Sequence, residues 1–330
     1  SRVSARHDVR DGTQRTAGSF FSTASQLLAP VDQTIDSLEA TADFRSGPFQ
    51  ASVSYYGSWF RNNASSLTWA NPFKPLVAGA QRGELALAPD NEFNQLSVAG
   101  AYDMGPRLRI TGDMAWGQMT QDAAFLSASL NPALVATLPA ASLAGRVNTF
   151  NGNARASSQI TDDLRLTATY SRDNRDNRTR SLAWPAVVTD LEIESAARVN
   201  QPFSFTRDLF KAAAEYRGPG SIRATAGFDY DRRDRTRQEV ATTQEVTGWM
   251  RFAARPASGL SVSLKVLHAQ REPDDYGSVS WISPAENPLM RKFNMAARMR
   301  DAVQAQADTA VGDNVNLSFS VDYAWDRYNK

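Results

Sequence analysis

The chain has 330 residues with no cysteine and two histidines, and its 36 lysines and arginines nearly balance its 35 aspartates and glutamates. The near-zero net charge provides no field that would attract nucleic acid. The lack of cysteine excludes disulfides, a cysteine nucleophile and covalent haem attachment through a CxxCH motif in this chain. GxGxxG, P-loop, GxSxG and HExxH motifs are absent too, so we expect a protein that is not an enzyme.

Alternating apolar and polar residues dominate the chain, a pattern typical of strands with one apolar face. A first strand is expected near 12–21, followed by a short outer loop near 22–32. Six hairpins follow, each with two runs of about a dozen residues, roughly twice the usual strand of a soluble domain. Their tight turns are expected near residues 47, 105, 162, 219, 258 and 313, giving thirteen strands in all.

The hairpin around Gly105 illustrates the pattern, because Ile110 and Met114 alternate with Arg109 and Asp113. A strand of about 12 residues, tilted by about 45°, rises roughly 28 Å, which matches the apolar band of an outer-membrane barrel. No run of about 18 apolar residues could form a transmembrane helix. Long polar connections separate the hairpins, at about 62–92, 120–145, 173–204 and 273–294.

Tight turns at one end and long loops at the other predict a transmembrane, antiparallel, up-and-down β-barrel in the bacterial outer membrane. The turns would be periplasmic and the loops extracellular. A soluble sandwich would have to bury the charges of the polar phase at great cost. The residues expected to face the lumen and a partner there are Arg109, Asp113, Arg165, Arg223, Asp229 and Lys265. Those expected in an aromatic girdle at the membrane interface are Trp59, Trp116, Tyr170, Tyr230 and Trp325.

Residues 1–330 are expected to form a single domain that is part of a larger barrel. The last strand, 315–328, starts at a turn and ends at the loop side, whereas a complete bacterial barrel has an even number of strands with both ends in the periplasm. The first residues do not have the pattern of a signal peptide.

Several polar clusters have two interpretations. The arginine-rich segments 172–180 and 231–237 could bind lipopolysaccharide phosphate or a partner protein, or could be solvated loops and strand ends with compensating charges. The acidic segments 190–194 and 272–275 give a weak indication of calcium binding. His268 is expected as an interfacial side chain near the outer rim, and His7 has no evident partner in the sequence.

A succession of short segments in and beside the expected loops is the most distinctive part of the sequence. It comprises segments 30–32, 55–60, 66–73 (Ser-Leu-Thr-Trp-Ala-Asn-Pro-Phe), 83–93 and 117–126. This succession resembles the MtrB/PioB family of outer-membrane proteins associated with decahaem cytochromes. The resemblance implies a barrel at the upper end of the usual strand range, with a periplasmic multihaem cytochrome in its lumen and the haems carried by that partner. A cysteine pair found near the N-terminus of some members is missing here.

The resemblance therefore implies an insulating sheath for electron transfer across the outer membrane. Outer-membrane lipid and lipopolysaccharide are expected partners, an extracellular cytochrome is a further candidate, and nucleic acid is not expected. An open diffusion porin for small solutes shares every periodic feature and remains the alternative. An outer-membrane enzyme would need a clustered nucleophile and base, which two isolated histidines do not supply.

Overall fold

A single large antiparallel sheet makes up most of the molecule. The computed structural model describes residues 1–20, 23–73, 79, 81–188, 190–277, 291–311 and 315–328. Thirteen strands follow one another across the sheet in chain order, as in an up-and-down topology. They are β1 (Arg2–Phe20), β2 (Thr23–Ser46), β3 (Phe49–Asn62), β6 (Asn91–Met104), β7 (Leu108–Gln121), β8 (Gly145–Gln159), β9 (Leu164–Asn177), β14 (Phe205–Arg217), β15 (Arg223–Arg235), β16 (Thr242–Ala257), β17 (Leu260–Pro273), β18 (Arg298–Val311) and β19 (Val315–Tyr328).

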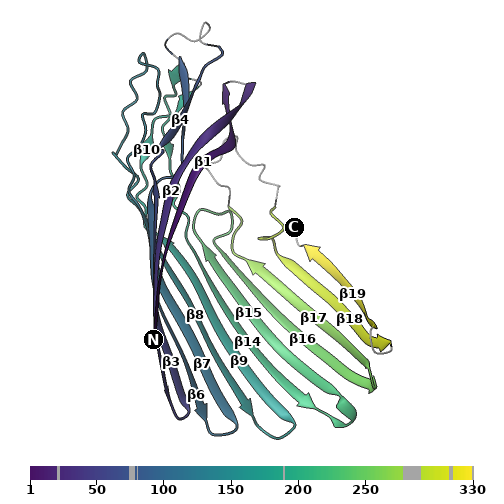
Figure 1. The fold of residues 1–330 in the computed structure, drawn as a ribbon. Helices are drawn as coiled ribbons and strands as arrows, with labels where there is room; N and C mark the ends of the chain where they lie inside the picture. Colours follow the sequence, from purple (N-terminus) through teal and green to yellow (C-terminus); the bar gives the residue numbers. More distant parts are fainter. Residues whose placement is uncertain are drawn as a thin grey trace.

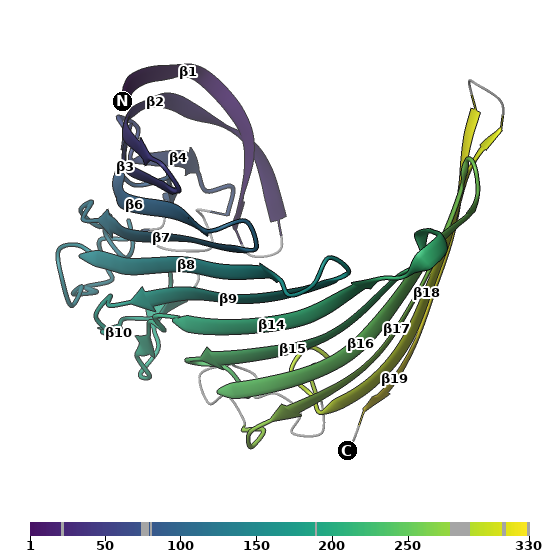
Figure 2. The same ribbon diagram turned by 90° about the horizontal axis from the view of Figure 1, so that it is seen from below.

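The tight turns gather at one end of the sheet and the long loops at the other (Figure 1). Seen from below, the sheet is strongly curved and twisted (Figure 2), as expected for long strands with the usual right-handed twist. Within the described part of the chain, β1 and β19 each pair with one neighbour only. No helix among the described residues is long and apolar enough to cross a membrane.

Glycines in the left-handed region close several of the turns. Gly47, Gly105 and Gly259 have φ angles of 53°, 71° and 85°, which residues with a Cβ rarely adopt. The turn after β14 contains the short 3₁₀ segment η1 (Pro219–Ser221). The predicted turns near 47, 105, 162, 219 and 258 are confirmed by the strand boundaries, whereas the one near 313 lies outside the described residues.

The long connections contain more structure than the sequence indicated. The expected loop 62–92 folds into a hairpin of β4 (Ser66–Ala70) and β5 (Arg82–Ala86). In the expected loop 173–204, β9 continues to Asn177 and two short pairs follow. These pairs join β10 (Ala183–Trp184) to β13 (Arg198–Val199) and β11 (Val187–Val188) to β12 (Glu192–Ile193). A single bridge, Ala124 to Ser142, closes the connection 120–145. The connection 273–294 is only partly within the described residues.

The prediction for the first hairpin is wrong. The expected outer loop near 22–32 is largely strand, because β1 pairs with β2 without interruption from Arg2–Thr41 to Phe20–Thr23. Backbone hydrogen bonds hold this ladder together whatever its side chains are. A strand that lies outside the apolar band can therefore be polar on both faces, and its sequence then lacks the alternation that predicts a strand. The pairing of β2 with β3 begins only at Gln33–Asn62. The part of the hairpin beyond Gln33 is therefore a two-stranded ribbon.

The residue pairing defines one apolar face across the sheet. Leu96 lies opposite Trp116, Val98 opposite Met114 and Tyr102 opposite Ile110. These side chains are exposed rather than packed; the exposed fraction of Met114 is 42% and that of Phe319 is 64%. A continuous exposed apolar surface of this extent marks contact with lipid or another apolar partner.

The five aromatic residues predicted for the girdle all belong to this apolar face by their pairing. Tyr170, Phe210 and Tyr230 follow one another directly across β9, β14 and β15. The rings of Trp116 and Phe150 have centroids 5.5 Å apart. Their position at the membrane interface remains a prediction.

Both histidines have an aspartate partner on the neighbouring strand of this face. His268 Nδ1 lies 2.7 Å from Asp301 Oδ1. His7 Nδ1 lies 2.6 Å from Asp36 Oδ1, a partner that was not evident from the sequence. The two residues are 29 positions apart in the sequence, and the long β1–β2 ladder brings their side chains together.

The few buried side chains lie toward the loop ends, because a single curved sheet has no second layer to cover it. Ala29, Val240, Ala269, Met295 and Ala296 are all less than about a tenth exposed. On the ribbon, the rings of Phe20 and Trp69 of β4 have centroids 5.6 Å apart. The loops therefore supply what small core the described residues contain.

Replacing Met114 by arginine tests which face meets lipid. We expect Met114→Arg in the full chain, refolded into lipid vesicles, to lower the free energy of unfolding by about 2–4 kcal/mol, the cost of a cation at the membrane midplane. Ala115→Arg is the matched control, because Ala115 lies beside Met114 on the opposite face between Ser97 and Asn151. It should change the value by only about 0.5 kcal/mol. Urea unfolding followed by tryptophan fluorescence measures both, and equal losses would contradict the assignment of faces.

Candidate functional site on the polar face

The face opposite the apolar one carries charged and small polar side chains on every strand from β2 to β19. All six residues predicted to face the lumen belong to it. Asp103, Arg109 and Ser157 lie side by side across β6, β7 and β8. Ala99, Asp113 and Asn153 lie side by side across the same strands, four residues farther along β7. A further row contains Arg165, Glu215, Thr225, Arg251, Lys265, Gln304 and Asp322. Arg223 and Asp229 lie on the same face of β15 as Thr225.

These six residues do not form one cluster. Arg109 donates to Asp103 at 3.1 Å, and Asp113 accepts from the Asn153 amide at 3.1 Å. Arg165 donates to the Gln159 amide oxygen, also at 3.1 Å. Each of these three side chains is therefore held by a contact to a neighbouring strand and lies on a wide, shallow surface.

Two of the six converge on Trp249 of β16. The Trp249 indole N–H donates to Asp229 at 3.3 Å, and the Lys265 ammonium lies 5.2 Å from the indole ring centre. The indole also lies over Gly227, where a Cβ would come within 2.3 Å of it. Since only a glycine leaves this space, Trp249 lies flat along the polar face.

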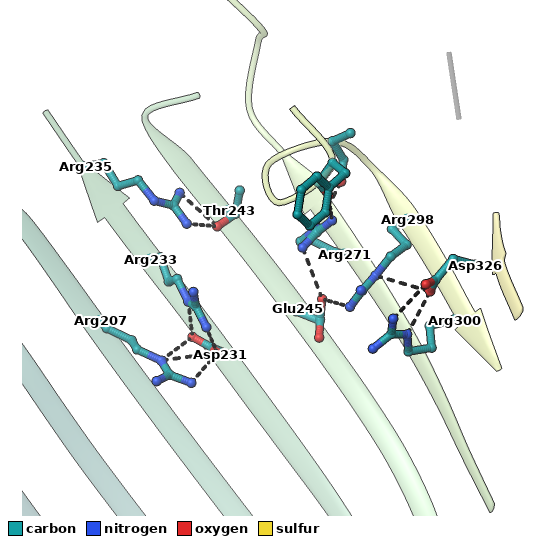
Figure 3. A network of polar contacts seen from close by, with 12 residues as sticks. Arg207, Asp231, Arg233, Arg235, Thr243, Glu245, Arg271, Arg298, Arg300 and Asp326 are labelled. Atoms are coloured by element: carbon teal, nitrogen blue, oxygen red, sulfur yellow. Dashed lines mark hydrogen bonds and ion pairs between the residues drawn. The ribbon is translucent and has the colours of Figure 1, made fainter. Parts of the chain in front are cut away.

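A belt of two neighbouring groups of ion pairs lies on the polar face near the loop ends of β14–β19 (Figure 3). This loop-end arginine belt comprises Arg207, Asp231, Arg233, Glu245, Arg271, Arg298, Arg300 and Asp326. Asp231 accepts from Arg207 at 2.7 Å and from Arg233 at 3.0 Å. Asp326 accepts from Arg300 through both guanidinium edges, at 2.6 and 2.7 Å. Such bidentate pairs fix geometry as well as charge.

Like charges lie directly opposite each other within the belt. Arg207 pairs with Arg233 and Arg271 with Arg298 across neighbouring strands, an arrangement that is destabilising by itself. A shared carboxylate offsets each repulsion: Asp231 lies between the first two, and Glu245 lies 2.9 Å from Arg298 and 3.9 Å from Arg271. Each of the two arginine pairs thus shares one carboxylate, which offsets part of the repulsion between its guanidinium groups.

The backbone of the segment 293–296 covers one part of the belt, at Arg271. Arg271 donates to the backbone carbonyls of Phe293 at 2.6 Å and Ala296 at 3.0 Å. As a result the side chains of Arg271 and Arg298 are only 12% exposed. The neighbouring Arg235 donates to the Thr243 hydroxyl at 3.1 Å.

The belt was not predicted from the sequence. The segment 231–237 stood out as a charge cluster, but the strand β15 distributes it over both faces, with Arg233 in the belt and Arg232 bound to Asp234 on the apolar face. The segment 172–180 divides in the same way, since Arg172 contacts Asp208. A usable signal was the recurrence of charges on the polar phase at the loop ends of six successive strands.

The acidic segments suggested for calcium are used in other contacts. Asp190 accepts from Ser129, Glu194 lies 3.2 Å from Arg198, and Asp274 accepts from the Thr242 amide. Among the described residues, no three histidine or acidic side chains come close enough together to hold a metal ion. The structure therefore gives no support to a calcium site there.

Comparison with known proteins places this sheet in context. The model of the outer membrane beta-barrel porin family MtrB/PioB matches residues 1–330. The outer membrane protein MtrB of Shewanella baltica (strain OS185) is 29% identical over 326 residues, which are 99% of this chain and 46% of that protein. The chain thus spans about half the length of the curated relative it matches.

Solved outer-membrane proteins are only distantly similar. OmpT of Vibrio cholerae matches 99% of this chain and 100% of its own, at 11% identity and a TM-score of 0.33. The toluene transporter TodX of Pseudomonas putida matches 98% of this chain and 85% of its own, at 9% identity and a TM-score of 0.30.

Removing the carboxylate of Glu245 tests the belt. Glu245→Gln leaves the nearly buried Arg271 and Arg298 facing each other without their shared counter-ion. We expect the free energy of unfolding to fall by about 1–3 kcal/mol. Asp162→Asn is the control, because its partner Arg107 and the 93% exposed Asp162 form a solvated pair whose loss costs about 0–1 kcal/mol. Equal effects in urea unfolding would show that the belt contributes no more than a surface pair.

Proposed function

The chain belongs to the MtrB/PioB family of outer-membrane β-barrel porins, and from this premise we propose that it forms part of the wall of a barrel that houses a multihaem cytochrome. In this proposal the barrel is an insulating sheath for electron transfer across the bacterial outer membrane. The tight turns face the periplasm and the long loops the outside, following the general rule for such barrels.

The observation that carries the proposal is the separation of the two faces. Thirteen strands present a continuous apolar surface on one side and ion-paired, hydrogen-bonded polar groups on the other. A barrel built on this sheet needs further strands, because β1 and β19 do not pair with each other in the described residues. Barrels of 16 or more strands leave a bore wide enough for solutes or a plug.

The chemistry would belong to the partner. The chain contains no cysteine, so it cannot attach haem through thioether bonds, and electron transfer would run through haems that the cytochrome carries. The wall would exclude lipid and orient the cytochrome through side chains such as Arg109, Asp113 and Lys265. An extracellular cytochrome at the loop end and lipopolysaccharide around the rim are further proposed partners.

Purification of the native complex in mild detergent tests the sheath directly. We expect this chain to co-migrate with haem-stained protein and with a Soret band in the visible spectrum, at a fixed ratio through size-exclusion chromatography. An open diffusion porin would instead purify without haem and conduct ions in planar bilayers, and that result would overturn the proposal.

Added bulk on the polar face provides a second test. Ala302 and Ala305 lie on β18 on opposite faces, Ala302 between Leu267 and Ala324 and Ala305 between Leu264 and Val321. If the bore is filled by protein, Ala302→Trp should weaken cytochrome retention, because overpacking costs about 1–3 kcal/mol, or about 5- to 150-fold in affinity. Ala305→Trp should have no effect. Retention is read as haem per barrel, and unchanged haem in Ala302→Trp would argue against close contact at this strand.

A further inference from the structure

The polar face carries a second group of arginines, at the tight-turn end of β14–β18. They line a pocket of about 550 Å³, which we name the turn-end arginine pocket. The side chains that matter for its chemistry are those of Arg217, Arg223, Arg251, Arg255, Ser261 and Asp308. With four arginines and one aspartate, the lining has a formal surplus of three positive charges.

Two like-charged cross-strand pairs meet at this pocket. Arg217 lies opposite Arg223, and Arg251 lies opposite Lys265. Direct opposition of like charges destabilises a sheet, and the loop-end arginine belt compensates for it with a carboxylate between each pair. At the turn end, Glu215 is shared in the same way by Arg217 and Arg223, at 3.4 and 3.6 Å, whereas no described carboxylate forms an ion pair with Arg251 or Lys265. Among the described residues, Arg251 and Arg255 have no ion-pair partner.

The single acidic group of the lining is already occupied by hydrogen bonds from its own sheet. Asp308 accepts from Ser318 at 2.5 Å, from the Gln306 amide at 3.0 Å and from Ser261 at 3.5 Å. It is therefore oriented toward these donors, and no described arginine forms an ion pair with it. Among the described residues, the pocket thus contains two guanidinium groups, those of Arg251 and Arg255, without an ion-paired carboxylate.

The backbone around the pocket is irregular in two places. The pairing of β16 with β17 shifts by one residue between Ala254 and Ala257, which places Arg255 in a bulge. Bulges redirect side chains and are frequent beside functional sites. Across the pocket, Ser221 has a φ of 65°, a left-handed conformation that costs energy for a residue with a Cβ. Both irregularities border the same concave surface.

We propose that the turn-end arginine pocket binds a cluster of carboxylates on the surface of the protein housed in the bore. The inference rests on the proposed function and specifies one contact of it. Arginine forks match the planar geometry of carboxylates, and their weak hydration favours such interfaces. Incoming carboxylates would take the place that Asp231 and Glu245 occupy in the belt. Binding would thereby relieve the repulsion between the facing cations of the free barrel, and this relief would contribute to the free energy of binding.

The test uses the double variant Arg251→Gln/Arg255→Gln in the full chain. Arg155→Gln is the matched control, because Arg155 is an exposed arginine of the same face, between Thr111 and Thr169, without an ion pair among the described residues. Citrate, a tricarboxylate, is the probe for isothermal titration calorimetry in detergent, with acetate and inorganic pyrophosphate in parallel. Haem per barrel after purification at two salt concentrations reports retention of the cytochrome.

We expect the double variant to bind citrate about tenfold or more weakly and to lose cytochrome at moderate salt, while Arg155→Gln matches the unmodified protein. Its urea midpoint should be unchanged or higher, because removing facing cations relieves repulsion; a purely structural role predicts a lower midpoint. Unchanged citrate binding, or pyrophosphate binding without any effect on cytochrome retention, would overturn the inference. If the unmodified protein carries no haem, the proposed function fails. The housed protein then also fails as the source of the carboxylates, whether or not the pocket binds citrate.

Discussion

The backbone hydrogen-bond ladder is the constraint on which the rest of this structure depends. In lipid, a strand must satisfy its N–H and C=O groups on its neighbours, and one continuous set of antiparallel pairs joins the thirteen strands, with one side of β1 and of β19 unpaired among the described residues. Because side chains alternate along a strand, a fixed ladder also fixes which of them share a face. One apolar surface and one polar surface follow from that single register.

The ladder has an electrostatic consequence. It brings residues opposite one another for backbone reasons, and in this chain it repeatedly brings cation against cation. At the loop end the sequence supplies the missing anions from the same face, as Asp231 and Glu245 show. At the turn end Arg251 and Lys265 face each other without such a residue. The two ends of one surface therefore differ: at the first, a shared carboxylate lies beside each facing arginine pair, and at the second, no described carboxylate forms an ion pair with Arg251 or Arg255.

Much of the fold could be predicted from the sequence, since alternation and glycine turns are local signals. Gly47, Gly105 and Gly259 marked real turns, and the phase of Ile110 against Arg109 was enough to separate the faces. The ribbon of β1 and β2 could not be predicted in the same way, because polar strands pair through their backbones and leave no alternating pattern. The loop-end arginine belt was not predicted from the sequence for another reason. Arg271 and Arg298 become neighbours only when β17 and β18 pair in this register, and the recurrence of charges on the polar phase does not state which of them lie opposite each other.

The ribbon formed by β1 and β2 changes the shape of the barrel mouth. Its ladder continues for about ten residues past the point where β3 leaves it, which corresponds to roughly 33 Å of extended chain. The β4–β5 hairpin packs against it through Trp69, so this flank is braced. The loop-side edge of the described sheet is therefore uneven, because this ribbon and the hairpin packed on it extend beyond the point where β3 leaves the ladder.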